Sequence, residues 1–304
     1  MSHNILPIIS EFLGYLRDFR RYSDNTIRSY TTDLEHYQAF CMNFDPEKNI
    51  IHQDENTIKA YLNSLSVAGL GARTMARRLA SIKSFYKYLL LKKYIKVNIA
   101  QAVKTPRLKK ELPHYLSLKE AQHILTLPKG KDIVALRHRL ILELFYSTGM
   151  RISELISLQI EDIRVEESLI HVIGKGNKER LVLIGKEAQK VLKLYIVELH
   201  NTGEKSPYLF PSLRKGKNNI HRHISNRTVF DIVKKYLKIV SNDEKLSPHS
   251  LRHTFATHML NNGADLMVIK DLLGHSSLSS TQVYTHLQQE KLKEVYKQAH
   301  PHGK

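Results

Sequence analysis

Apolar residues recur at helical spacing through the first hundred positions, with short polar turns between the repeats. This periodicity predicts helices over about 5–20, 24–40, 54–67 and 72–93. The last helix carries an apolar stripe in steps of four, three, four and three residues, formed by Met75, Leu79, Ile82, Tyr86 and Leu89. Such steps keep one face toward a core. The pattern therefore predicts a helical amino-terminal domain.

The second part of the chain combines helices with one alternating segment. Helices are predicted to begin after Ser117 and after Ser153, and to extend over about 133–147, 186–200, 225–240, 248–261 and 264–273. Over residues 160–184, apolar and polar side chains instead alternate, and turn-forming residues cluster at 166–168 and 174–178. This pattern predicts a three-stranded antiparallel meander. The polar stretch 203–219 is predicted to be a surface loop. The expected fold class is mainly α with a small β-meander.

The run KTPRLKKELP, residues 104–113, separates the two parts. It combines two prolines with several cationic side chains and has no core-forming pattern, so it is predicted to be an extended linker. The predicted organisation is a helical domain over 1–103, the linker over 104–113, a second domain over 114–287, and a carboxy-terminal helix and tail over 288–304.

The charge of the chain is strongly positive. Lys and Arg number 47 against 29 Asp and Glu, a formal net charge of +18. Residues 1–107 hold 16 basic and 9 acidic side chains and the remainder holds 31 and 20, so both halves carry an excess. A polyanionic partner is favoured, and nucleic acid is the commonest one. A protein that is basic without binding nucleic acid remains the alternative.

The cysteine content and the hydropathy favour a cytoplasmic protein. Cys41 is the only cysteine, so no intramolecular disulfide can form, and its place in an apolar-periodic helix predicts a buried side chain. The first residues lack the pattern of a secretory signal. No apolar run is long enough to span a bilayer, so no membrane partner is expected.

Candidate chemistry gathers near the carboxy terminus. Ser247-Pro248 is a helix start signal, and it places His249 and Arg252 on one face near a helix amino terminus, where anions are favoured. His275 follows Gly274, a predicted helix cap, and Tyr284 comes nine residues later. Each of these residues alone is weak evidence of a catalytic site.

Four motifs together carry a resemblance to a known family. In chain order they are TGMRISEL, VIGKGNKERLV, SPHSLRHTFATHML and LLGHSSLSSTQVYTH, and they resemble the tyrosine recombinases, most closely the bacterial Xer recombinases. The likeness extends over almost the whole chain and is dense over 145–290. The ending LKEVYKQAHP resembles the XerC branch. One departure is Leu183, where the family commonly has proline.

The resemblance implies a complete catalytic set. Arg151 and Arg252 would be the two arginines that hold the scissile phosphate, and Lys175 the lysine on a hairpin. His249 and His275 would be the active-site histidines and Tyr284 the nucleophile. The expected reaction cleaves and rejoins DNA through a 3′-phosphotyrosine intermediate, with no metal and no other cofactor.

The resemblance also implies how the molecule works on DNA. The two domains would form a clamp around double-stranded DNA, and four subunits would pair two sites. The helix at about 288–299 would dock on a neighbouring subunit; packing on its own domain is the alternative. The expected role is resolution of chromosome dimers at a dif-type site before cell division. The tetramer would consist either of this chain alone or of this chain with a second Xer-type recombinase. A DNA translocase that activates the complex is a further candidate partner.

Four cations of the fourth predicted helix lie off its apolar stripe: Arg73, Arg77, Lys83 and Lys87. They are predicted DNA contacts, because arginine and lysine on a presented helix reach phosphates and base edges. An ordinary solvated helix face is the alternative for these side chains.

Three other functions are weighed against this one. His249 and His253 lie four apart, as zinc ligands of a nuclease can, but the glutamate of a HExxH site is absent. Cleavage that persists in EDTA would separate the two mechanisms. A non-catalytic DNA-binding protein explains the charge but not the set of site residues. A phage or transposon integrase would share the chemistry.

Overall fold

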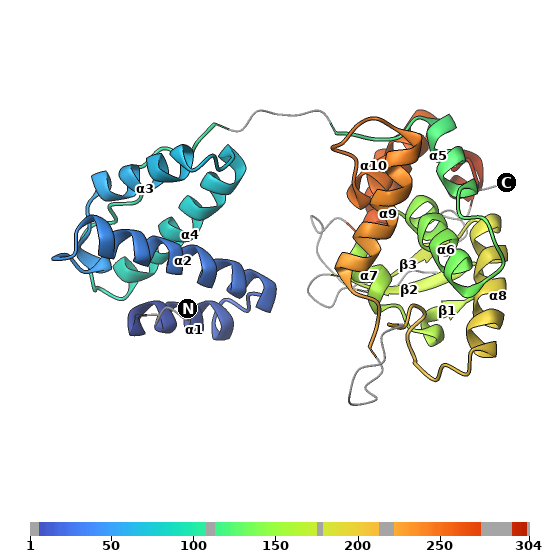
Figure 1. The fold of residues 1–304 in the computed structure, drawn as a ribbon, viewed down its shortest axis with the longest axis horizontal. Helices are drawn as coiled ribbons and strands as arrows, with labels where there is room; N and C mark the ends of the chain where they lie inside the picture. The colour runs from blue at the N-terminus through green and yellow to red at the C-terminus, as the bar shows by residue number, and fades with distance from the viewer. Residues whose placement is uncertain (1–5, 108–112, 175–178, 213–221, 275–293, 303–304) are drawn as a thin grey trace. The chain divides into compact units, whose positions relative to one another are not determined.

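The chain forms two compact units, 1–111 and 112–304 (Figure 1). The computed structural model describes residues 6–107, 113–174, 179–212, 222–274 and 294–302. The division between the units falls within the predicted linker, 104–113. Each unit has its own hydrophobic core.

The amino-terminal unit is helical throughout its regular structure. Its elements are α1 (Pro7–Asp18), α2 (Asp24–Phe44), the short 3-10 helix η1 (Ile50–His52), α3 (Glu55–Val67) and α4 (Ala72–Leu91). Helix α2 packs on α1, α3 and α4. The predicted stripe of α4 faces this core: Leu79, Ile82, Tyr86 and Leu89 are fully buried, and Met75 packs at the edge. The helical amino-terminal domain is thus confirmed.

Helix α2 continues four residues past the predicted end at Phe40. The extra turn is stabilised by packing. The rings of Phe40 and Phe44 stack with their centroids 5.3 Å apart, and the side chain of Cys41 is buried. Burial raises the pKa of the Cys41 thiol to about 11, which leaves it protonated at neutral pH. Cys41 is therefore a packed core residue, as predicted.

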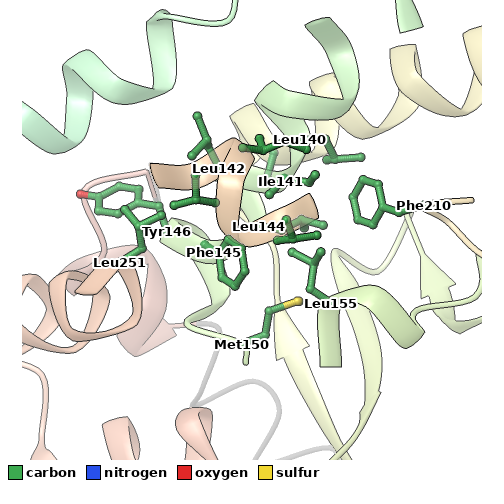
Figure 2. Packing of buried hydrophobic residues seen from close by; sticks show 14 of the residues in the cluster. Leu140, Ile141, Leu142, Leu144, Phe145, Tyr146, Met150, Leu155, Phe210 and Leu251 are labelled. Carbon is green, nitrogen blue, oxygen red and sulfur yellow. The ribbon is translucent and has the colours of Figure 1, made fainter. Parts of the chain in front are cut away.

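The carboxy-terminal unit is built around one buried helix. Its helices are α5 (Leu118–Thr126), α6 (Ile133–Thr148), α7 (Ile152–Ser157), η2 (Ile160–Asp162), α8 (Lys186–Asn201), α9 (Asn226–Val240), α10 (Pro248–Asn261) and α11 (Leu266–Leu273). Helix α6 packs on α5, α8, α9 and α10. Figure 2 shows its side chains Ile141 and Phe145 in one packed cluster with Met150 and Leu155. The start of α7 is thereby fixed on the core.

A three-stranded sheet lies in the same unit, with strand order β1-β2-β3. The strands are β1 (Ile163–Arg164), β2 (Leu169–Ile173) and β3 (Glu179–Leu183). Both pairs are antiparallel, and Val172 of β2 is opposite Arg180 of β3. The predicted meander is confirmed. Lys175, which the sequence places between β2 and β3, lies outside the described residues.

The prediction of a surface loop over 203–219 is wrong for its central residues. Leu209 and Phe210 are fully buried in the core of the unit, and Figure 2 shows Phe210 beside that cluster. The backbone there is also paired, because Leu209 N donates to Leu158 O at 2.9 Å and Ile224 N donates to Phe210 O at 2.7 Å. The sequence pattern did not indicate this burial, because the short apolar group is flanked by polar residues and glycines. Residues 213–221 lie outside the described structure.

The described part of the carboxy-terminal tail, 294–302, packs on its own unit. Tyr296 and Ala299 join a small core with Phe255 and Met259 of α10. The ring of His300 stacks on Tyr296 at 4.7 Å, and its Nε2 lies 3.1 Å from Tyr146 O. Docking on a neighbouring subunit stays a prediction, and residues 288–293 lie outside the described residues.

In the described parts of the chain, no helix has both the length and the apolar character to cross a membrane.

Candidate active site

Arg151 stands at the junction of α6 and α7. Helix α6 ends at Gly149, which adopts a left-handed conformation with φ 59°. A Cβ at this position would lie 2.7 Å from side-chain atoms of both Phe255 and Leu273, so only glycine lets the turn approach α10 and α11 this closely. Arg151 then caps α7, with its side chain 32% exposed.

Arg252 projects from the second turn of α10 toward the same turn. Its Nη1 donates to Gly149 O and its Nη2 donates to Leu273 O at the end of α11. The Arg252 residue is only 8% exposed. A guanidinium has five N–H groups, so these two bonds leave three for another acceptor. Arg151 reaches the same helix end, because its Nη2 donates to Gly274 O at 3.4 Å. The two arginines are thus brought together.

A buried carboxylate and a third arginine support this pair. Glu154 Oε1 accepts from Arg151 Nη1 at 2.7 Å, and Glu154 Oε2 accepts from Arg151 N at 2.7 Å. Arg180 of β3 binds both oxygens of the same carboxylate, at 2.9 and 2.8 Å. Sequence analysis missed Glu154 and Arg180. Their spacing could have indicated both residues. Glu154 is an acidic residue three positions after Arg151 in a predicted helix, which suits an ion pair. Arg180 shares a strand face with the apolar Val182, which indicates a buried arginine that needs a partner.

The electrostatics of the cluster favour an anion. Burial alone would raise the pKa of the Glu154 carboxyl, but the hydrogen bonds and the charge of Arg180, together with the hydrogen bonds of Arg151, outweigh it and lower the pKa to about 2. Burial, then the charge of Arg151, lowers the pKa of Arg252 to about 10; Glu154 opposes this shift and Arg180 adds to it. With these pKa values Glu154 and Arg252 are both charged at neutral pH. Three guanidinium groups against one carboxylate leave a positive excess that a bound phosphate would relieve.

Glu154→Gln is expected to destabilise the protein at neutral pH by about 3 kcal/mol. The pKa of Glu154 is depressed in the folded state, from 4.5 to about 2. Its stabilising contribution is therefore present above pH 4.5 and lost as the pH falls toward 2. Urea unfolding of both proteins at a series of pH values measures this. A difference in unfolding free energy that stays constant between pH 7 and pH 2.5 would contradict the ionic role of Glu154.

The six predicted site residues are described only in part. Arg151 and Arg252 converge as above. His249 lies on α10 one turn before Arg252, with an exposed side chain. Lys175, His275 and Tyr284 lie outside the described residues, although His275 directly follows Gly274, which accepts from Arg151.

The zinc alternative rested on two histidines of α10. His249 and His253 are both exposed there. Burial, then the nearby His249 and Arg252, lowers the pKa of His253. Within the part of the chain that the structure describes, no three His, Cys, Asp or Glu side chains gather as a metal site would require. The nearby Arg252 guanidinium suits an anionic ligand better than a metal ion.

Two family models match the chain, and together they cover both units. The phage integrase family matches residues 114–291, and the N-terminal SAM-like domain of phage integrases matches residues 9–93. A XerC tyrosine recombinase of Thermodesulfovibrio yellowstonii is 39% identical over 97% of each chain. A XerD tyrosine recombinase of Haemophilus ducreyi is 38% identical over 98% of each chain. The chain belongs to the phage integrase family, among the Xer tyrosine recombinases.

Solved structures share the fold of this recombinase. The XerH recombinase bound to a palindromic difH substrate, in a post-cleavage complex, superposes with a TM-score of 0.68 at 22% identity, covering 94% of this chain and 83% of that one. Residues 75–356 of lambda integrase, as a dimer on a COC' core site, give a TM-score of 0.66 at 17% identity, covering 91% and 98%. The activity of the family is site-specific cleavage and rejoining of DNA, and this chain is an enzyme of that class.

The four predicted DNA contacts occupy different surroundings on α4. Arg73 and Lys87 are exposed, and Lys83 is partly buried. Arg77 forms an ion pair with Asp33, a fully buried carboxylate of α2 that also accepts from Ser81 Oγ at 2.8 Å. Arg77 therefore has a structural partner inside its own unit, which the sequence pattern did not reveal.

Proposed function

We propose that this recombinase cuts and rejoins DNA with Tyr284 as its nucleophile, and resolves chromosome dimers at a dif-type site in the cytoplasm before cell division. The observation that carries the catalytic part is the convergence of Arg151 and Arg252 on the end of α11, around the buried carboxylate of Glu154. The biological part is supported by relatives named XerC and XerD over nearly the full chain. It is further supported by a structural neighbour bound to a difH substrate.

The two arginines suit the transition state of the reaction. Attack on a phosphodiester concentrates negative charge on its two non-bridging oxygens. Planar guanidinium groups meet such oxygens with paired hydrogen bonds, which an ammonium group cannot do. Because both arginines are already held on backbone carbonyls or on Glu154, little reorganisation is needed when the charge develops.

The remaining four residues form the covalent bond, move protons and bind the phosphate. The Tyr284 oxygen attacks phosphorus, the bond from phosphorus to the 5′ oxygen breaks, and a 3′-phosphotyrosine forms. An unperturbed tyrosine has a pKa of about 10, so it needs a base at neutral pH, and we assign this role to His249. Lys175 donates the proton to the leaving 5′ oxygen. His275 hydrogen-bonds the phosphate.

Rejoining follows from the covalent intermediate. The phosphotyrosine ester keeps the energy of the broken phosphodiester bond. A 5′-hydroxyl of a partner strand attacks this ester, the phosphodiester bond re-forms, and Tyr284 recovers its proton. The balance of bonds requires no nucleotide cofactor.

The test of the proposed function is a nicked duplex that carries the candidate site. After cleavage, the short fragment bearing the 5′-hydroxyl diffuses away, so the covalent complex accumulates. Incubation in EDTA, followed by peptide mapping of the adduct, is expected to place the DNA on Tyr284. An adduct on another residue, or cleavage without an adduct, would overturn the assignment.

DNA contact by α4 is tested through salt dependence. Lys87→Ala is expected to reduce the slope of log affinity against log salt by about 0.9, the value for one lost phosphate contact. Lys59→Ala is the matched control, because Lys59 is an exposed lysine of α3 paired with Glu55 at 2.7 Å. Filter binding at several salt concentrations measures both slopes. An unchanged slope for Lys87→Ala would place that side chain on an ordinary solvated face.

The proposed assembly is a tetramer on two paired sites, in which the tail beyond residue 288 docks on a neighbouring subunit. A second Xer-type recombinase and a DNA translocase are the proposed partners.

Deleting residues 288–304 is expected to abolish cooperative pairing of two sites, measured by gel mobility. Because Tyr296 and His300 are buried in their own unit, the deletion should also lower stability. His300→Ala is the control, with lower stability but retained cooperativity. Full cooperativity after the deletion would contradict docking of the tail on a neighbouring subunit.

A further inference from the structure

Arg180 lies behind the two candidate phosphate-binding arginines. It is only 6% exposed, and it is the second residue of β3, five positions after Lys175. Its Nη1 and Nη2 donate to the two oxygens of Glu154 at 2.9 and 2.8 Å. Its Nε donates to Leu272 O at 3.2 Å. One side chain thus joins the sheet, the start of α7 and the end of α11.

Arg180 binds a group that supports Arg151, and it also binds the residue next to one that supports Arg252. Glu154 holds the side chain and the backbone N of Arg151, each at 2.7 Å. Leu272 precedes the two residues whose carbonyls accept from Arg252 and Arg151. Arg180 is therefore bonded to Glu154, which holds Arg151, and to the backbone one residue before the carbonyl that holds Arg252, while it remains buried itself.

The end of α11 is also shaped around this side chain. Gly274 caps the helix in a left-handed conformation, with φ 64°. A Cβ at this position would lie 3.0 Å from Arg180 Cδ and 3.1 Å from Arg180 Nη1. The close approach of Gly274 fixes the backbone immediately before His275 against the Arg180 guanidinium.

We propose that Arg180 is a positioning residue, which sets the placement of Arg151 relative to Arg252 and does not contact DNA. The inference rests on the proposed function, because it assigns both of those arginines to the scissile phosphate. A planar guanidinium suits this role, since its rigid fork can bind a carboxylate with two N–H groups while the third position reaches a carbonyl. Because Arg180 is the second residue of β3, the same bonds join the start of this strand to Glu154 and to the end of α11. The connection that precedes β3 in the sequence contains Lys175.

The first test compares cleavage rates in single turnover. Arg180→Met removes all three hydrogen bonds, and Arg180→Lys keeps a positive charge beside Glu154 but lacks the fork. Displacement of catalytic groups by about 1 Å costs on the order of 100-fold in rate, so a loss of that size is expected for Arg180→Met, and a smaller one for Arg180→Lys. DNA affinity is expected to be unchanged. Arg164→Met is the matched control, because Arg164 is an exposed strand residue whose ion pair with Glu167 spans 3.6 Å.

The second test distinguishes positioning from general damage to the fold. A methylphosphonate at the scissile position replaces a charged oxygen with a neutral methyl group, so the arginine pair has less charge to stabilise. The deficits of Arg180→Met and of Arg252→Ala, each relative to wild type, are both expected to shrink on this substrate. The deficit of Lys175→Ala is expected to persist, because the leaving oxygen still needs its proton.

The outcomes separate this inference from the proposed function. If Arg252→Ala is impaired but Arg180→Met cleaves like the wild type, the positioning role is overturned and the proposed function stands. Equal deficits of Arg180→Met on both substrates would also overturn the positioning role. If Arg252→Ala itself cleaves normally, the proposed function fails first. Should Arg180→Met not fold, as judged by circular dichroism, Arg180→Lys gives the same comparison.

Discussion

Tyr284→Phe is expected to abolish DNA cleavage and leave binding of the recombination site intact. The substitution removes only the phenolic oxygen, which in the proposed reaction forms the covalent bond to phosphorus, and keeps the ring. Loss of the nucleophile from an enzyme that works through a covalent intermediate costs on the order of 10⁶-fold, so no adduct should be detected. Denaturing gel electrophoresis of the nicked duplex measures the adduct, and a mobility shift measures binding.

The EDTA condition and a mixing experiment strengthen this test. Wild-type cleavage is expected to persist in EDTA, whereas a metal-dependent nuclease would lose its activity. Tyr284→Phe subunits should still enter mixed complexes with wild-type subunits on paired sites, since their fold and DNA contacts are unchanged. Residual cleavage by Tyr284→Phe alone would mean that another group attacks the phosphate.

Arg252→Lys is expected to slow cleavage and rejoining by about a thousandfold, the scale of an arginine that stabilises phosphoryl transfer. The charge is conserved, but one ammonium group cannot bond both Gly149 O and Leu273 O and still present a pair of donors to phosphate. Single-turnover cleavage and the reverse ligation reaction should lose rate together, because both pass through the same charged transition state.

The control for Arg252→Lys is Arg227→Lys. Arg227 is an exposed arginine of α9 that pairs with Asp231 at 2.9 Å, so the change should leave both rates as they are. Fluorescence anisotropy on the same DNA reports whether affinity is retained. An Arg252→Lys enzyme with the wild-type rate of cleavage would show that positive charge alone is sufficient and that the paired geometry is unimportant.

The local structure could be predicted because it depends on neighbours in the sequence. The stripe of α4, for example Leu79 and Ile82, needs only helical spacing to indicate a buried face, and it is buried. Gly149 and Gly274 end helices in the left-handed conformation that glycine adopts readily. The failure at Leu209 and Phe210 came from two apolar residues in a polar context, whose partners are distant in the sequence.

The sequence by itself determined the succession of helices, the three-stranded meander, the positive charge of both halves and the order of the family motifs. Only the tertiary structure decided that Glu154 lies between Arg151 and Arg180, and that Arg77 pairs with the buried Asp33. Periodicity reports which face of an element is buried, whereas ion pairs between elements depend on how the core brings those elements together. A buried charge is stable only with its partner in place, and packing places that partner.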